Sequence, residues 1–172
     1  MSENGKIGVE IERKYVIKMP DASIIRSQHY HTESEILQIY LPSEKGETRR
    51  IRRRIYKDKT ICTETKKIRI DNISSTEIER EITTAEFAEL EGIALKDRTP
   101  ITKTRHSFIL DGQLFEIDIY PQWKFTAIME TELENREKQV KIPEFIEIVS
   151  EVTGDKSYSN ASMSKKMPKE LV

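Results

Sequence analysis

Alternation of apolar and polar residues with a period of two constrains the fold of this chain most strongly. Such alternation places successive side chains on opposite faces of a strand. It recurs in runs rich in Ile, Thr, Tyr and Val, near residues 7–17, 35–42, 48–57, 60–69, 75–83, 100–110, 113–120 and 126–135. We therefore expect eight strands in an α+β protein made mainly of antiparallel sheet.

Segments that break the alternation predict helices. Thr84 is expected to cap a helix over residues 85–95, with Gly92 as a weak point inside it. A shorter helix is expected within residues 21–29, and another from Pro143 onward, because proline suits the first turn of a helix.

The chain has 172 residues, a length that suits one domain over residues 1–172 with frayed ends at 1–6 and 162–172. Its 29 basic and 30 acidic residues give a net charge of −1, which argues against a broad nucleic-acid-binding surface. No apolar run is long enough to span a membrane or to act as a secretion signal. Cys62 is the single cysteine, so we expect a protein of the reducing cytoplasm without disulfides.

The alternation also places charged residues on one face of nearly every predicted strand, and the charges are grouped by strand. A single strand of this kind suits an ordinary solvated face, but acids on some strands and bases on others indicate two walls of one site. The acids are Glu10, Glu12, Glu77, Glu79, Glu116, Asp118, Glu130 and Glu132, and the bases are Lys14, Arg50, Arg52, Arg54, Lys67, Lys103 and Arg105.

Eight antiparallel strands that close into a barrel would enclose these charges in a lumen wide enough for one small ligand. Buried charges are costly unless they are paired, hydrated or bound to ions. Carboxylates bind Mg²⁺ or Mn²⁺, and arginine and lysine bind phosphate oxygens. The sequence therefore predicts a charged tunnel with flanking helices, which holds a polyanion together with a divalent metal.

Residues 10–14, Glu-Ile-Glu-Arg-Lys, have the ExExK pattern of the first strand in CYTH proteins, the triphosphate tunnel metalloenzymes. Further elements of that family follow in order over residues 9–161. They resemble its QxYL (38–41), paired-arginine (50–52), TxK (65–67), ExExxI (77–82), KxR (103–105), ExD (116–118), ExEL (130–133) and EVT-tail (151–160) segments. The short chain is most similar to the bacterial inorganic triphosphatase branch.

The resemblance implies hydrolysis of a triphosphate inside an eight-stranded tunnel, with roles for individual residues. The implied metal ligands are Glu10, Glu12, Glu130 and Glu132, with Asp118 helping directly or through water. The implied phosphate ligands are Arg50, Arg52, Lys67, Lys103 and Arg105, with Arg54 nearer the tunnel mouth. Supporting roles fall to Glu116, and to Glu77 and Glu79, which bind a second metal or, as we favour, hold the basic wall in place.

Lys14 is the candidate base that activates water, provided that neighbouring cations lower its pKa. Tyr40 shares the inward face of its strand and could orient Lys14, whereas the alternative role for Lys14 is a phosphate clamp. Lys66 and Lys67 compete for the inward position, and the spacing favours Lys67.

The three histidines have no expected catalytic role. His29 and His31 precede the second strand and are predicted to lie on the surface, and His106 lies on the face opposite Arg105.

The resemblance leaves several functions open. Hydrolysis of inorganic tripolyphosphate is favoured, with nucleoside triphosphates as further substrates. Thiamine triphosphatase, class IV adenylate cyclase and a non-enzymatic polyphosphate-binding module are the alternatives. The expected partner is a small polyphosphate, and a homodimer through the outer strand faces stays open.

Overall fold

The eight predicted strands are all present in the computed structural model, which describes residues 5–171. They are β1 (Lys6–Lys18), β2 (Thr32–Leu41), β3 (Glu47–Tyr56), β4 (Lys59–Arg69), β5 (Ser74–Ile82), β6 (Ile101–Leu110), β7 (Gln113–Ile119) and β8 (Thr126–Glu132). A short ninth strand, β9 (Ile148–Glu151), accompanies α1 (Ala22–Arg26), α2 (Thr84–Glu91), the 3-10 helix η1 (Lys156–Tyr158) and α3 (Asn160–Met163).

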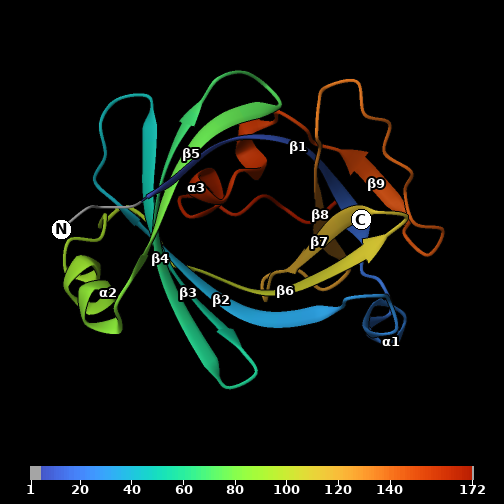
Figure 1. Ribbon diagram of the computed structural model, residues 1–172, viewed down its shortest axis with the longest axis horizontal. Coiled ribbons are helices and arrows are strands. Elements are labelled where there is room, and N and C mark those ends of the chain that lie inside the picture. The colour runs from blue at the N-terminus through green and yellow to red at the C-terminus, as the bar shows by residue number, and fades with distance from the viewer. Residues whose placement is uncertain (1–4, 172) are drawn as a thin grey trace.

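The strands form a closed antiparallel barrel, as predicted, and appear as a ring in Figure 1. Their order is β5-β4-β3-β2-β6-β7-β8-β1, and pairing of β5 with β1 closes the ring. Tight turns help to set this order. Between β6 and β7, Asp111 and Gly112 form a two-residue turn with φ of 50° and 74°, the positive values that a hairpin with this twist requires.

The helix predicted from Pro143 is wrong, because this segment supplies β9 instead. One edge of β1 pairs with β5 over residues 6–11, and beyond residue 11 the two strands are no longer paired. The later part of β1, Tyr15–Ile17, therefore has a free edge, and β9 pairs with it. An unpaired edge of the long first strand thus recruits a segment whose own sequence suits the start of a helix.

The helix around residues 84–95 is present but begins and ends earlier than predicted. Its cap is Thr83, not Thr84, because the Thr83 hydroxyl accepts from the Glu86 amide while the Glu86 carboxylate reaches back to Thr83. Gly92 is the C-cap of α2 rather than an internal residue. At eight residues α2 is the longest helix in residues 5–171, far short of the about 20 that span a bilayer.

Two apolar clusters cover the outside of the barrel wall. One joins the outer faces of β2 to β5, including Ile51 and Cys62, to Phe87 of α2. The other joins the outer faces of β1, β6, β7 and β8 to Ile25 of α1 and to Ile146. The hydrophobic core therefore lies outside the wall, which leaves the inner face to polar groups.

A third apolar cluster closes one end of the lumen. Inward residues Val16, Tyr40 and Tyr120 pack there against Tyr158 of η1 and Met163 of α3. The C-terminal residues, which we expected to fray from about residue 162, lie against this end. The Trp123 indole donates to the Pro168 carbonyl, and the Thr126 amide donates to the Glu170 carboxylate.

Candidate active site

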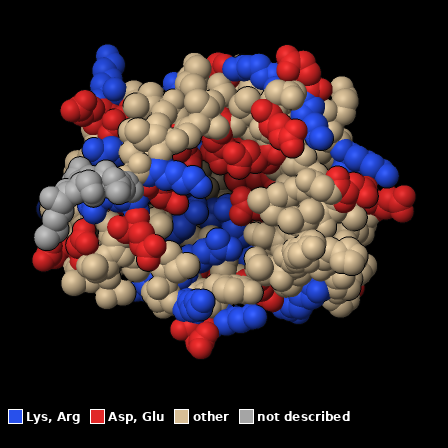
Figure 2. All heavy atoms as spheres, in the orientation of Figure 1, with Lys and Arg blue, Asp and Glu red and all other residues tan. Residues whose placement is uncertain are grey.

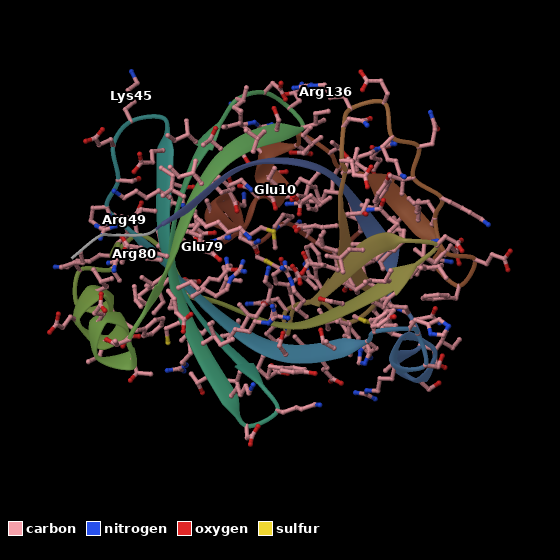
Figure 3. All side chains as sticks on the ribbon, in the orientation of Figure 1. Glu10, Lys45, Arg49, Glu79, Arg80 and Arg136 are labelled. Atoms are coloured by element: carbon pink, nitrogen blue, oxygen red, sulfur yellow. The ribbon has the colours of Figure 1, made fainter. Side chains whose placement is uncertain are left out.

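The lumen carries the predicted acidic and basic groups on opposing strands. Figure 2 shows a hollow in the middle of the molecule, where acidic atoms gather above basic ones. In Figure 3, Glu10 and Glu79 lie toward the inside of the ring, whereas Arg49 and Arg80 lie on its outer side near α2. The period-two parity thus separates charges that line the site from charges that pair outside it.

The acidic wall brings carboxylates together across β1 and β8. Glu12 lies directly opposite Glu132 in the strand register, an arrangement that is destabilising for like charges. Burial raises the pKa of Glu10 to about 7 although Lys67 opposes the shift, and repulsion from Glu12 and Glu77 adds to it. Burial also raises the pKa of Glu12 and of Glu132, and neighbouring glutamates reinforce both shifts.

Lys67, not Lys66, is the inward lysine of β4. Its ammonium lies 3.0 Å from Glu10 and 3.1 Å from Glu77, whereas Lys66 is exposed on the outer face. Lys67 and Glu77 also face each other in the β4–β5 register. Lys67 therefore belongs to a basic strand but contacts carboxylates of the acidic wall.

The arginines of β3 form the middle of the basic wall. Arg52 donates from Nε and NH2 to the Gln38 side-chain oxygen, at 3.0 and 2.7 Å. Arg54 donates to the Ser34 hydroxyl. Arg50 differs, because its Nε is buried and has no hydrogen-bond partner among residues 5–171. A buried guanidinium with a free donor is suited to an oxyanion.

Lys103, Arg105 and Asp118 form a buried ion-pair network. The Lys103 ammonium lies 2.6 Å from Asp118 Oδ2, and Arg105 donates to both Asp118 oxygens at 2.7 and 2.8 Å. Burial alone would raise the pKa of Asp118, but Arg105 and Lys103 hold it well below its usual range. Both oxygens of Asp118 are thus engaged by the basic wall, whereas the resemblance implied that Asp118 helps to bind metal.

The environment expected for Lys14 was wrong, because carboxylates surround it rather than cations. Its ammonium lies 3.1 Å from Glu130 and 3.8 Å from Glu12. Burial opposes the charge, but Glu130 and Glu12 raise the pKa of Lys14 above its ordinary value. Tyr40 lies in the cluster that closes the lumen, and no hydrogen bond joins it to Lys14 in the described part of the chain.

The supporting carboxylates hold other wall residues. Glu79 accepts a hydrogen bond from Thr65, and Glu116 lies 2.9 Å from Arg105. The predicted site did not assign roles to Thr65, Gln38 or Ser34, which orient its charged groups. Their signal was present, since each shares the inward parity of its strand.

The chemistry of the lumen fits a divalent metal beside a phosphate chain. Glu10, Glu12 and Glu132 offer hard oxygen ligands, and burial, reinforced by neighbouring glutamates, raises the pKa of each. Glu130 can join them, although Lys14 now pairs with it. A cation at this wall would relieve the repulsion of Glu12 by Glu130 and Glu77.

We expect Mg²⁺ affinity to weaken about tenfold for each pH unit below 7, because Glu10 must lose one proton to bind metal. Titration of Mg²⁺ into the protein between pH 5.5 and 8.5 measures this dependence. The Glu10→Gln variant should bind Mg²⁺ more weakly and lose this part of the pH dependence. An affinity that stays constant across this range in the wild type would exclude Glu10 as a ligand.

Comparison with known proteins identifies similar solved structures, although no family model and no curated protein matches the chain. The inorganic triphosphatase NE1496 shares 26% identity over 92% of this chain and 96% of its own, with a TM-score of 0.59. A second structure of NE1496 gives 26% identity over 92% and 99%, with a TM-score of 0.57. The PH1012 protein of Pyrococcus horikoshii OT3 is similar in fold, with 17% identity, 74% and 81% coverage and a TM-score of 0.55.

Fold and site together define a closed antiparallel barrel protein whose charged lumen has an acidic and a basic wall. The order of its strand motifs and its similarity to NE1496 agree on one family. In fold and in the order of its strand motifs, the chain is similar to the CYTH family, the triphosphate tunnel proteins.

Proposed function

We propose that this protein is a metal-dependent hydrolase that cleaves inorganic tripolyphosphate inside its lumen and releases phosphate. The observation that carries the proposal is the unpartnered, buried Nε of Arg50 in a basic wall that faces clustered glutamates. Similarity to the inorganic triphosphatase NE1496 supports the same function. The proposal includes a small polyphosphate as partner, Mg²⁺ or Mn²⁺ as metal and the cytoplasm as location.

Hydrolysis forms a bond between a water oxygen and the terminal phosphorus while the bond to the bridging oxygen breaks. Phosphate and pyrophosphate leave, and the water gives up a proton. This reaction depends on positioning and charge neutralisation more than on covalent chemistry. Arg50 and Arg52 would bind the phosphate oxygens, and the buried Arg105 would add fixed positive charge. Burial lowers the pKa of Lys103 to about 7 although Asp118 opposes the shift, so Lys103 is only partly charged near neutral pH.

The acidic wall would hold the metal through Glu10, Glu12 and Glu132, with Glu130 beside them. A divalent cation there would supply charge neutralisation for phosphate oxygens and would reduce the negative field that now keeps Lys14 protonated. With that field reduced, the Lys14 amine could accept the proton of water. Lys14 otherwise acts as a cationic clamp, and an alkaline optimum of turnover would favour the base.

Arg50→Ala should lower kcat/KM for tripolyphosphate about 50-fold, because a charge-assisted contact to phosphate is lost. Its unfolding free energy should fall only slightly, since Arg50 Nε has no hydrogen-bond partner to lose and the guanidinium interacts only with Tyr40 and Glu77 among the groups that raise its pKa. Steady-state kinetics and urea unfolding measure the two effects.

Arg49→Ala is the matched control, because Arg49 is the preceding residue but points outward to Glu64 at 2.7 Å. It should lose stability and keep activity. Equal activity of the two variants would remove Arg50 from the substrate site.

The alternatives are separated by their products. Purified protein is incubated with tripolyphosphate, ATP or thiamine triphosphate, with Mg²⁺, Mn²⁺ or EDTA, and phosphate, pyrophosphate and cyclic AMP are measured. The proposal predicts metal-dependent release of phosphate, fastest from tripolyphosphate. Cyclic AMP with pyrophosphate from ATP would make the protein a cyclase, and tight binding without turnover would make it a binding module.

The closed end of the lumen favours the inorganic substrate. Tyr40, Tyr120 and Tyr158 pack there with Trp123, and Trp123 contacts Tyr120 and Tyr158 edge-on. Because Trp123 packs against both Tyr120 and Tyr158, we expect these rings to support one another rather than to stack on a nucleobase.

A homodimer through the outer strand faces stays a prediction.

A further inference from the structure

A second group of metal-ligating side chains lies outside the lumen, where β2 begins beside β6. It consists of His31, Glu33 and His106, and one ligand atom from each lies within 4.8 Å of the others. In the strand register Glu33 is directly opposite His106. The adjacent pair, Ser34 and Arg105, has the inward parity, so the wall of the barrel separates the histidines from the lumen.

The distances suit a shared ion. His31 Nε2 lies 3.0 Å from His106 Nδ1, and the ring centroids are 5.3 Å apart. Two nitrogens bound to one tetrahedral zinc at about 2.0–2.1 Å lie roughly 3.3 Å apart. A shift of a few tenths of an ångström would therefore turn this histidine contact into a pair of metal ligands.

The third ligand is already oriented by a cation on α1. A Glu33 carboxylate oxygen lies within 4.8 Å of one ligand nitrogen of each histidine, and Arg26 donates to both Glu33 oxygens at 3.0 and 3.1 Å. A carboxylate oxygen has a second lone pair, so Glu33 can bind a metal while it accepts from Arg26. Such outer contacts are what hold metal ligands in position.

Protonation and access are also suitable. Burial lowers the pKa of both histidines, with Arg26 adding to the shift and Glu33 opposing it, so the neutral imidazoles present lone pairs at pH 7. His106 is 2% exposed, whereas His31 and Glu33 are partly exposed and give an ion a path from solvent. Glu35, the other carboxylate facing His106, accepts a hydrogen bond from Thr104.

We propose that His31, Glu33 and His106 form a second metal site on the outer surface, selective for imidazole-binding cations of the zinc class. Two nitrogens and one carboxylate favour Zn²⁺, Ni²⁺ or Cu²⁺ over Mg²⁺, whereas the lumen offers oxygen ligands alone. Three protein ligands leave a fourth position for water. The bound ion would fasten the segment before β2 to β6 and stabilise this part of the wall.

The test is titration of Zn²⁺ into EDTA-treated, dialysed protein in the presence of saturating Mg²⁺, followed by calorimetry. We expect one equivalent of Zn²⁺ to bind, with a rise in the melting temperature. His31→Gln and Glu33→Gln should each weaken binding about tenfold or more. His29→Gln is the control, because His29 is an exposed histidine two residues from His31 and outside the group.

Visible absorption of the Co²⁺-substituted protein reports nitrogen ligation independently of stability, and the tetrahedral bands should disappear in His31→Gln. Unchanged Zn²⁺ affinity in both His31→Gln and Glu33→Gln would overturn the proposal. So would Zn²⁺ binding that saturating Mg²⁺ abolishes, since this result would place the ion in the lumen.

Discussion

Replacement of Glu12 by glutamine is expected to reduce metal-dependent phosphate release from tripolyphosphate about 100-fold or more. Glu12 lies opposite Glu132 on the acidic wall, and burial together with repulsion from Glu130 raises its pKa. Glutamine keeps the shape but removes the charge that a divalent metal needs. The measurement is the initial rate of phosphate release at saturating Mg²⁺.

The control for this loss is Glu35→Gln. Glu35 is an exposed glutamate on the outer face of β2, where it accepts a hydrogen bond from Thr104. Its variant should retain the wild-type rate. Glu12→Gln should also remain as stable as the wild type without metal, because it removes a like-charge repulsion. A Glu12→Gln protein that turns over at the rate of Glu35→Gln would contradict the acidic wall as the metal site.

Asp118→Ala is expected to lower the free energy of unfolding by about 3–5 kcal/mol. Lys103 and Arg105 are 2% and 7% exposed, and removal of Asp118 would leave the buried Arg105 guanidinium and the Lys103 amine without their shared partner. The cost arises from uncompensated charge rather than from the loss of a favourable pair alone. Urea unfolding monitored by circular dichroism measures it.

Glu116→Ala provides the comparison, because Glu116 also contacts Arg105 but has a more exposed side chain. Its loss should be no more than about 1 kcal/mol. If Asp118→Ala unfolds like the wild type but no longer binds Mg²⁺, Asp118 is a metal ligand and not the anchor of the basic wall.

The strands and the two walls could be predicted because local parity determines them. Arg50 and Ile51 are adjacent in sequence, yet Arg50 lines the lumen and Ile51 is fully buried in the outer cluster beneath α2. Side chains alternate between the two faces of a strand, so one apolar position on the outer face places the residues on either side of it on the inner face. The same alternation distinguished Lys67 from Lys66, because the spacing of residues 65–67 places Lys67 on the inner face.

The predictions that were wrong concern features that depend on contacts between segments distant in the sequence. Residues 148–151 become a strand because Tyr15–Ile17 has a free edge after β1 leaves β5, which local sequence cannot reveal. The protonation of Lys14 likewise depends on Glu130, which lies 116 positions along the chain but directly opposite in the register. Burial of charge is a tertiary property, so its effect on pKa follows only from the fold.

In the proposed function, a triphosphate lies between the two walls of the lumen. The most direct test is a crystal structure with Mn²⁺ and a tripolyphosphate analogue that has methylene bridges, with anomalous scattering to locate the metal. We predict manganese at Glu10, Glu12 and Glu132, and phosphate oxygens within hydrogen-bond distance of Arg50 and Arg52. If manganese and the analogue both bind on the outer surface and the lumen holds neither, the lumen is not the substrate site.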